Sequence, residues 1–275
     1  HSYEELFCQG HFREQGGRQR WQTAGASRLD ELRRLTRPLV LHRRKQQVLE
    51  LPPKQRSFEG IDLDAGELRG FDYRLRLVID DYRQRVAEGL VRSDAEFLAV
   101  LTALRQIAAG FKLPAAQQLV QRLRKQHKPT VVFSSFVDPL LLLHERLGGV
   151  LLTGRQKPEQ RQLAVDCFQA GETDLLLATF AAGGLGFTLH RAQHVVLLER
   201  PWTPGDIDQA EDRCHRIGME GGLISHWLQL GLADQLVDGL VASKAERIEL
   251  LLGPRRLSLE RQPLPKMLSR CLQDL

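Results

Sequence analysis

Short apolar runs alternate with helix-like segments through the second half of this 275-residue chain. Each run is too short for a core helix and is bounded by turn residues, which is typical of a buried strand. The runs cover residues 131–133, 150–152, 175–178, 195–198 and 223–230. Strands that alternate with helices of this length form a parallel sheet with helices on both faces. We therefore expect an α/β fold.

Loops that follow these strands are expected to converge at one edge of the sheet. In parallel α/β sheets, ligands bind at the carboxyl ends of the strands. Residues 134–136, 153–155 and 179–186 follow three of the predicted strands. Hydroxyl and backbone N–H groups in such loops can hold the phosphate oxygens of DNA without reading its bases. For Ser134 the alternative is an ordinary turn residue whose hydroxyl bonds its own backbone.

A glycine-rich turn and two arginines flank the fourth apolar run. The turn contains Gly183, Gly184 and Gly186, where the backbone can approach a ligand closely because glycine has no Cβ. A helix is predicted further on, and Arg213 and Arg216 would share one of its faces because they are three residues apart. Two guanidinium groups side by side suit an anionic ligand such as phosphate.

The same region resembles a known family. Residues 183–218 read GGLGFTLHRAQHVVLLERPWTPGDIDQAEDRCHRIG, which is similar to the paired motifs closing the second RecA-like lobe of superfamily-two helicases. The resemblance is to the Swi/Snf-type ATP-dependent DNA translocases, and ERPWTPGDIDQAEDRCHRIG is most similar to the HepA-related annealing helicases. It implies a RecA-like parallel sheet flanked by helices, preceded by a helical insertion and followed by a brace helix.

The resemblance also implies roles for individual residues. Arg213 and Arg216 would act as catalytic arginine fingers that complete an ATP site across the cleft between two lobes, with Gln209 and Gly184 also at the nucleotide. The implied cofactors are ATP and Mg²⁺, with the magnesium held by the first lobe. The residues expected to contact DNA are Ser134, Phe136, Thr153, Gly154, Arg155, Thr179, Gly183 and Trp202. Trp202 is expected to be exposed between two prolines, although an indole there could instead pack under its loop.

Two positions depart from the family pattern. Thr203 stands where the family usually has Asn, and Met219 stands where it usually has Gln. Neither is one of the arginines, so we expect altered coupling between the lobes rather than loss of the site.

A basic cluster precedes a double proline in residues 40–56. This segment reads VLHRRKQQVLELPPKQR and is similar to the RRxKxxVxxxLPxK signature that leads into the second lobe of Swi/Snf-type proteins. In that family the basic residues, here Arg43, Arg44 and Lys45, lie near the hinge between the lobes. The composition alone fits a solvated helix face in front of a linker equally well.

The chain divides into five predicted segments. They are a linker and hinge segment (1–57), a helical insertion (58–112), a RecA-like helicase C-terminal lobe (113–230), a brace helix (231–253) and a basic tail (254–275). In the first segment, Ser27 is expected to cap a helix over residues 28–41 that Pro38 kinks or ends. In the second, helical stripes stop near Gly110, before a new helix over residues 115–126.

Composition sets further limits. The chain has 39 Lys and Arg against 34 Asp and Glu, and this net charge of +5 is a mild signal for polyanion binding. Arginine outnumbers lysine, which favours phosphate ligands but also fits codon bias in a GC-rich genome. Four scattered cysteines without a CxxC pair, and histidines without shared ligand spacing, argue against a metal site or a disulfide framework. No apolar run approaches the roughly 18 residues of a membrane helix.

Two parts of a complete ATP motor are missing from the sequence. The glycine turn lacks the Lys-Ser/Thr ending of a GxxxxGK[ST] phosphate loop, and no strand-end carboxylate motif for magnesium follows from the pattern. The turn also fails the GxGxxG spacing of dinucleotide-binding enzymes. The chain begins with HSYEELF, so we expect it to be a piece of a longer protein, and the fragment alone should hydrolyse ATP negligibly.

The predicted function is therefore the C-terminal motor lobe of an ATP-dependent double-stranded DNA translocase, of the remodelling or strand-annealing type. The expected partners are DNA, mainly through its backbone, and the first RecA-like lobe of the same protein; no membrane is expected. The alternatives are a lobe of a strand-separating DNA or RNA helicase and a non-catalytic nucleic-acid-binding module. The expected location is the cytoplasm and nucleoid of a bacterium or the nucleus of a eukaryote, without secretion.

Overall fold

The structure is a computed structural model that describes residues 2–15, 18–23, 25–41, 43, 45–90, 94–183, 186–231, 234–235, 237–239 and 242. The chain forms two compact units. One consists of His1–Arg44 with Ala242–Leu275, and the other of Lys45–Val241. Each unit is described by itself.

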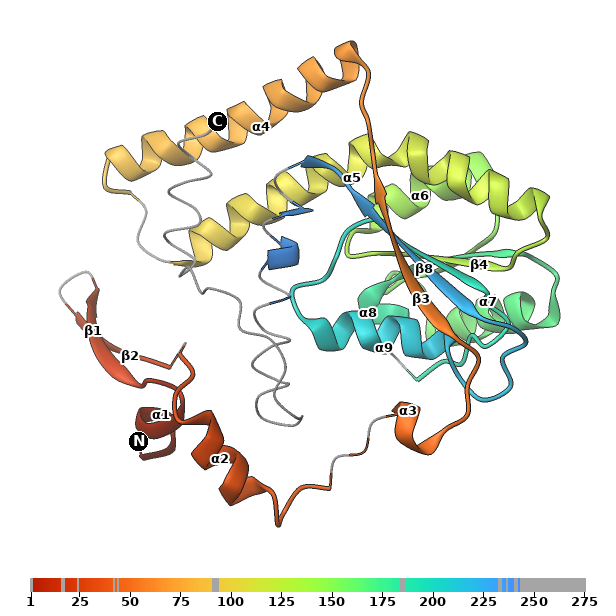
Figure 1. Ribbon diagram of the computed structural model, residues 1–275. Helices are drawn as coiled ribbons and strands as arrows, with labels where there is room; N and C mark the ends of the chain where they lie inside the picture. Colours follow the sequence, from red (N-terminus) through yellow and green to blue (C-terminus); the bar gives the residue numbers. More distant parts are fainter. Residues whose placement is uncertain are drawn as a thin grey trace. The chain divides into compact units, whose positions relative to one another are not determined.

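A parallel sheet is the centre of the larger unit (Figure 1). Among the described residues it has six strands: β3 (Lys54–Gly60), β4 (Thr130–Ser134), β5 (Val150–Leu152), β6 (Leu175–Thr179), β7 (His194–Leu197) and β8 (Leu223–Gln229). Their order is β3-β8-β7-β4-β6-β5, and every neighbouring pair is parallel. The α/β fold that the apolar runs predict is therefore confirmed.

Helices cover both faces of this sheet, as Figure 1 shows. α5 (Asp94–Lys125) and α6 (Val137–Leu147) cover one face, and α7 (Pro158–Ala170), α8 (Phe180–Gly183) and α9 (Pro204–Cys214) cover the other. α4 (Ala65–Ala87) packs on α5, and the short helix α3 (Lys45–Val48) precedes β3. Side chains alternate along each strand. Val131 and Val195 accordingly belong to the core under α7 and α9, whereas Val132 and Val196 belong to the core under α5 and α6. The two cores fix the positions of the strand ends.

The first strand of the sheet was not expected from the sequence. β3 pairs in parallel with β8 over seven residues, so the predicted boundary between residues 57 and 58 falls inside a strand. As an edge strand it is only half-buried, and its polar residues include Lys54, Arg56 and Glu59. Because edge strands carry charged residues that discourage pairing with other chains, β3 lacks the apolar run that marks a buried strand.

α5 also differs from the prediction. It is one continuous helix of 32 residues that passes through Gly110 and contains Pro114. A helix end was expected at Gly110 because glycine and proline disfavour helix interiors. Leu113, Ala116 and Val120 are buried against the sheet, and this packing outweighs the local preference for a break.

The smaller unit contains α1 (Ser2–Phe7), the antiparallel pair β1 (His11–Gln15) and β2 (Arg18–Gln22), and α2 (Leu29–Thr36). Ser27 does not cap α2: its hydroxyl donates to the Leu6 carbonyl at 2.6 Å, and Arg28 occupies the N-cap position. The helix ends before Pro38, in agreement with the expected stop.

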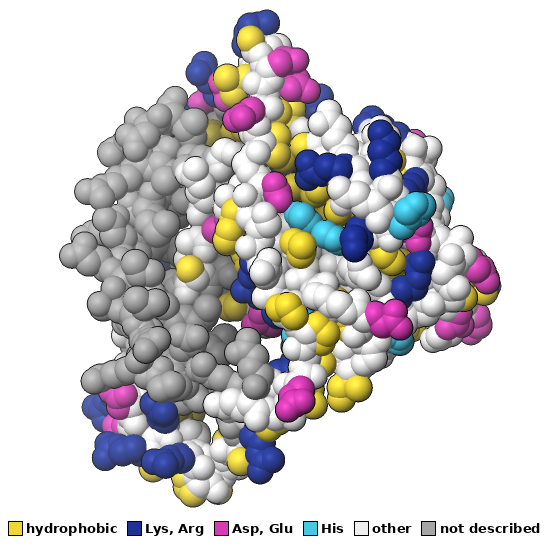
Figure 2. Space-filling model, turned by 45° about the vertical axis from the view of Figure 1, so that its right-hand side comes forward, with side chains coloured by type: hydrophobic (Ala, Val, Ile, Leu, Met, Phe, Trp, Pro, Cys, Tyr) yellow, Lys and Arg dark blue, Asp and Glu magenta, His cyan; other side chains and the backbone are white. Residues whose placement is uncertain are grey.

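Several predictions lie outside the described residues. They concern Gly184, most of the brace helix over 231–253 and the basic tail over 254–275. Within the described part of the chain, no helix combines the length and the apolar character needed to cross a membrane. The described side chains on the face shown in Figure 2 mix basic groups with acidic and hydrophobic ones, in keeping with the modest net charge.

Candidate functional site

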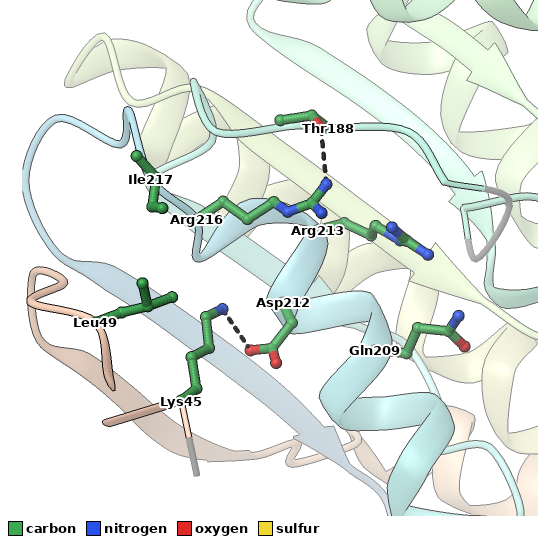
Figure 3. A pocket seen from close by; sticks show the side chains of 8 residues that line it. All are labelled: Lys45, Leu49, Thr188, Gln209, Asp212, Arg213, Arg216 and Ile217. Carbon is green, nitrogen blue, oxygen red and sulfur yellow. Dashed lines mark hydrogen bonds and ion pairs between the residues drawn. The ribbon is translucent and has the colours of Figure 1, made fainter. Parts of the chain in front are cut away.

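A pocket of about 630 Å³ lies beside the end of α9 (Figure 3). Its walls come from α3 and the residue after it, from the loop behind the glycine turn, and from α9 with the turn that follows. The lining residues are Lys45, Leu49, Thr188, Gln209, Asp212, Arg213, Arg216 and Ile217. Three of the eight are cations and one is a carboxylate, so the pocket favours an anionic ligand.

Both predicted arginines line this pocket, but only one of them is helical. Arg213 lies in the last turn of α9, which ends at Cys214, whereas Arg216 belongs to the turn after the helix. The expectation that a single helix carries both is therefore wrong. The Arg216 guanidinium donates to the Thr188 hydroxyl at 2.8 Å, which joins the arginine to the loop behind the glycine turn. Gln209 lies one helical turn before Arg213 and lines the same pocket.

α9 is held in place by ion pairs to β3. The Thr203 hydroxyl caps its first turn by accepting from the Asp206 N–H, and Pro204 occupies the first helical position. The Glu211 carboxylate is fully buried; it lies 2.7 Å from Arg56 and 3.1 Å from Lys54. Burial favours a higher pKa for Glu211, but the hydrogen bond and charge of Arg56 outweigh it and lower this pKa. The pair therefore stays ionised and fixes the helix that carries Arg213.

The pocket lies near the beginnings of β3 and β8. Past the end of α9, the His215 ring bonds the Pro52 carbonyl at 2.7 Å, and the Leu223 N–H donates to the Pro53 carbonyl at 2.9 Å. α9 lies in the crossover between the parallel strands β7 and β8, so it returns from their carboxyl ends to the opposite edge. The arginine pocket and the strand-end loops therefore lie at different ends of α9.

The three predicted loops do share the carboxyl edge of the sheet. They follow β4, β6 and β5, which are neighbouring parallel strands. The Ser134 side chain, however, is fully buried. Its hydroxyl donates to Glu199 at 2.7 Å and accepts from the Phe136 N–H at 2.9 Å. This geometry contradicts the expected phosphate contact of the Ser134 hydroxyl, which instead shapes the turn.

Other residues at this edge also shape the loops. The buried Thr153 and Thr179 hydroxyls accept from the N–H groups of Arg155 (3.4 Å) and Ala182 (3.3 Å). Gly183 ends the short helix α8, and a Cβ on it would lie 2.6 Å from the Phe133 ring. In this structure the two hydroxyls hold the loops in shape, and Gly183 leaves room for the Phe133 ring.

Other groups at the carboxyl edge of the sheet are exposed and could contact a polyanion. The Arg155 side chain is 65% exposed and lies 3.4 Å from the carboxylate of Asp138, which is more exposed still. A Cβ on Gly154 would meet no atom within 4 Å, so its backbone is open to an approaching ligand. Phe136, in the loop after β4, is also partly exposed.

Trp202 is less exposed than expected. Its indole packs partly buried against the core under α9, and the Arg105 guanidinium lies 4.5 Å from the ring centre. Arg105 comes from α5 and also donates to the Arg200 carbonyl (2.5 Å) and to the Ser135 hydroxyl (3.0 Å). The packed indole is the alternative that the sequence left open, and Arg105 was missed because nothing local marks it.

A buried charge network lies behind these loops and was also missed. Lys112 on α5 is fully buried, lies 2.6 Å from Asp234 and donates to the Leu198 carbonyl at 2.7 Å. Burial lowers the pKa of Lys112 and raises that of Glu199, although Asp234 and the Ser134 hydrogen bond oppose these shifts. The signal that could have revealed it is the Glu199-Arg200 pair directly after an apolar run, where charges are necessarily drawn into the core.

The described histidines form no ligand cluster. His194 and His226 lie 2.9 Å apart, and His226 is 2.9 Å from Glu59. Within the part of the chain that the structure describes, no group of three or more His, Cys, Asp or Glu could hold a metal ion.

Comparisons with known proteins give consistent matches. The family described as the helicase conserved C-terminal domain matches residues 97–218. The chain is 28% identical over 267 residues to the DNA annealing helicase and endonuclease ZRANB3 of Bos taurus, covering 94% of this chain and 24% of that protein. It is also 28% identical over 233 residues to the SWI/SNF-related matrix-associated actin-dependent regulator of chromatin subfamily A-like protein 1 of Xenopus laevis, covering 82% and 24%. The chain thus spans about a quarter of the length of these relatives.

Solved structures share the fold. The C-terminal part of the Fun30 ATPase domain matches with a TM-score of 0.57 at 16% identity, over 82% of this chain and 98% of that one. The Sulfolobus solfataricus SWI2/SNF2 ATPase core in complex with dsDNA also matches with a TM-score of 0.57, at 22% identity, over 78% of this chain and 50% of that one.

Proposed function

Because the chain carries a helicase conserved C-terminal domain and its relatives are Swi2/Snf2-type ATPases, we propose that it is the C-terminal motor lobe of an ATP-dependent double-stranded DNA translocase. In this proposal the lobe contributes arginine fingers and part of the DNA-binding surface. A first RecA-like lobe of the same protein grips ATP and its magnesium. The remodelling and strand-annealing types of translocase both fit the relatives' names.

The single observation that carries the proposal is the shared pocket of Arg213, Arg216 and Gln209. Guanidinium groups bind phosphate oxygens through paired N–H donors and keep their charge at any physiological pH. ATP, when bound, supplies the phosphoryl group whose transfer to water drives movement. Arg213 and Arg216 would stabilise the negative charge that develops on that group, an effect worth about 10³- to 10⁵-fold in rate. Gln209 would bind the nucleotide from the same wall of the pocket.

DNA is the proposed ligand of the carboxyl edge. Arg155, the Gly154 backbone and Phe136 are the groups open to a duplex there, and Trp202 supports the adjacent loop. Thr153, Thr179 and Gly183 would act by holding the loops in shape. Such contacts position a duplex without reading its sequence.

The test is ATP hydrolysis by the full-length protein with and without duplex DNA. Arg213→Ala or Arg216→Ala should abolish turnover, while the dissociation constant for duplex DNA changes by less than about threefold. Arg83→Ala, at an exposed arginine of α4, is the control and should keep both properties. If either single variant retained its ATP turnover, the assignment of the pocket would be disproved.

A further inference from the structure

We infer that Lys45 is a third cationic phosphate ligand of the arginine pocket, held there by Asp212 before the nucleotide enters. This inference rests on the proposed function, since it deepens the assignment of that pocket. Lys45 begins α3, far in sequence from α9, and its side chain points into the same space as Asp212 (Figure 3). Its Nζ lies 3.2 Å from the Asp212 carboxylate and also donates to the His215 carbonyl.

The ion pair of Lys45 is not needed to stabilise the fold. Its ion pair with Asp212 is partly exposed, with 26% and 40% of the two side chains accessible, and exposed pairs of this kind stabilise a protein little. α9 is already tied to β3 by the Lys54 and Arg56 pairs with Glu211. α9 is therefore anchored without the pair of Lys45 and Asp212, and the other structural contact of Lys45 is its hydrogen bond to the His215 carbonyl.

Asp212 has a second cation when Lys45 leaves. Lys54 Nζ lies 3.5 Å from the same Asp212 oxygen. Lys45 can therefore turn from Asp212 to an incoming phosphate without leaving the carboxylate unpaired. The ammonium group of lysine is suited to such a change of partner because it sits on a flexible four-carbon stem.

The charges favour the exchange. With Asp212 neutralised by Lys54, the pocket presents Lys45, Arg213 and Arg216 to a ligand that carries several negative charges. A ligand with several phosphate charges can accept charge-assisted hydrogen bonds from all three cations at once, and it carries more charge than the single Asp212 carboxylate. Nucleotide binding would then join α3 to α9 through the ligand, in the segment that leads into this lobe.

Lys54 provides a matched control. It pairs with Asp212 as Lys45 does, but it does not line the pocket. Substitution of either lysine removes one cation beside Asp212. Lys54 also pairs with Glu211, but Arg56 keeps that carboxylate paired when Lys54 is replaced. Only substitution of Lys45 removes a cation from the ligand space.

The experiment measures kcat and KM for ATP in the full-length protein. Lys45→Gln should raise the KM for ATP about tenfold, Lys54→Gln should change it less than threefold, and Lys45→Arg should restore it to within threefold of the wild type. Asp212→Asn breaks the same ion pair as Lys45→Gln, but it keeps the cation and removes a negative charge from the pocket, so it should lower KM. Lys45→Met, with an unfolding temperature measured beside it, replaces Lys45→Gln if that variant does not fold.

The outcomes separate this inference from the function on which it rests. An unchanged KM in Lys45→Gln, while Arg213→Ala abolishes turnover, overturns the role of Lys45 and leaves the arginine pocket standing. An equal rise of KM in Lys45→Gln and Asp212→Asn also overturns it, since the ion pair alone would then matter. Turnover that survives Arg213→Ala removes the proposed function and the inference together.

Discussion

The guanidinium of Arg105 on α5 lies against the indole of Trp202 in the loop that leads to α9, 4.5 Å from the ring centre. The same arginine donates to the Arg200 carbonyl at 2.5 Å and to the Ser135 hydroxyl at 3.0 Å. One buried side chain thus connects the long helix with two loops at the carboxyl edge of the sheet. Its loss would release both loops together.

Arg105→Met should therefore destabilise the protein by about 1–3 kcal/mol, because the buried Arg200 carbonyl loses its charged donor. Methionine keeps most of the apolar stem, so the hydrogen bonds and the contact with Trp202 are the main losses. Urea unfolding measures the change in the free energy of unfolding. Arg122→Met, at an exposed arginine of the same helix, is the control and should stay within about 0.5 kcal/mol of the wild type.

Gly183 and Gly154 offer a matched pair of glycine substitutions. Gly183→Ala would place a Cβ 2.6 Å from the buried Phe133 ring, and such overpacking costs about 1–3 kcal/mol of stability. Gly154→Ala adds a methyl group to open space and should change the free energy of unfolding by less than about 0.5 kcal/mol. Thermal unfolding of both variants compares them directly; equal stability would show that α8 shifts to accommodate the methyl group.

Apolar runs in the sequence predict the strands that helices cover, but they do not predict the exposed strand β3. Five strands, including the edge strand β5, follow from apolar runs because helices cover both of their faces, and such strands are apolar throughout. β3 escapes the pattern because it lies at an edge and carries Lys54 and Arg56, whose partners on α9 are more than 150 residues away. Such partners are set by the tertiary fold, which no local window contains.

The candidate site likewise contains residues that could be predicted from the sequence and residues that could not. Arg213, Arg216 and Gln209 could be placed in one pocket from their spacing and a family resemblance, even though the helix ends between the two arginines. The burial of Ser134 could not be predicted, since it depends on Glu199 across the sheet. Lys45 likewise joins the pocket only through the packing of α3 against α9.

The pair of His194 and His226 predicts a loss of stability in mild acid. Burial, assisted by the charges of His226 and Lys128, lowers the pKa of His194 to about 4, from an ordinary value near 6.5. Between pH 6.5 and pH 4, His194 is protonated in the unfolded chain but stays neutral in the folded protein. The free energy of unfolding therefore falls as the pH decreases through this window. The expected loss between pH 7 and pH 5 is about 2 kcal/mol.

The contribution of His194 is isolated by comparing the wild type with His194→Asn. Urea unfolding at pH 7 and at pH 5 gives the free energy of unfolding for each protein. The variant should lose about 2 kcal/mol less than the wild type over this interval. Parallel pH dependence of the two proteins would contradict a neutral, buried His194. Glu59 acts in the same direction at lower pH, because its bond to His226 lowers the pKa of its carboxyl group.

Arg155 gives the sharpest test of the proposed DNA surface. Its pair with Asp138 is exposed and 3.4 Å long, and pairs of this kind are weak enough for a phosphate to displace. In the full-length protein, Arg155→Ala should weaken duplex binding several-fold and lower the salt slope of the logarithmic affinity by about 0.9, the share of one phosphate contact. The loss should be uniform across DNA sequences, since backbone contacts carry no base information.

Fluorescence anisotropy with labelled duplexes of two unrelated sequences, over a series of salt concentrations, measures both quantities. Arg146→Ala is the matched control, because this exposed arginine near the end of α6 has been carried away from the carboxyl edge by the helix. A salt slope that falls equally in both variants would indicate general charge attraction instead of a contact at this edge. An unchanged salt slope in Arg155→Ala would show that the duplex does not contact the loop after β5. The DNA-binding surface would then lie on another part of the lobe.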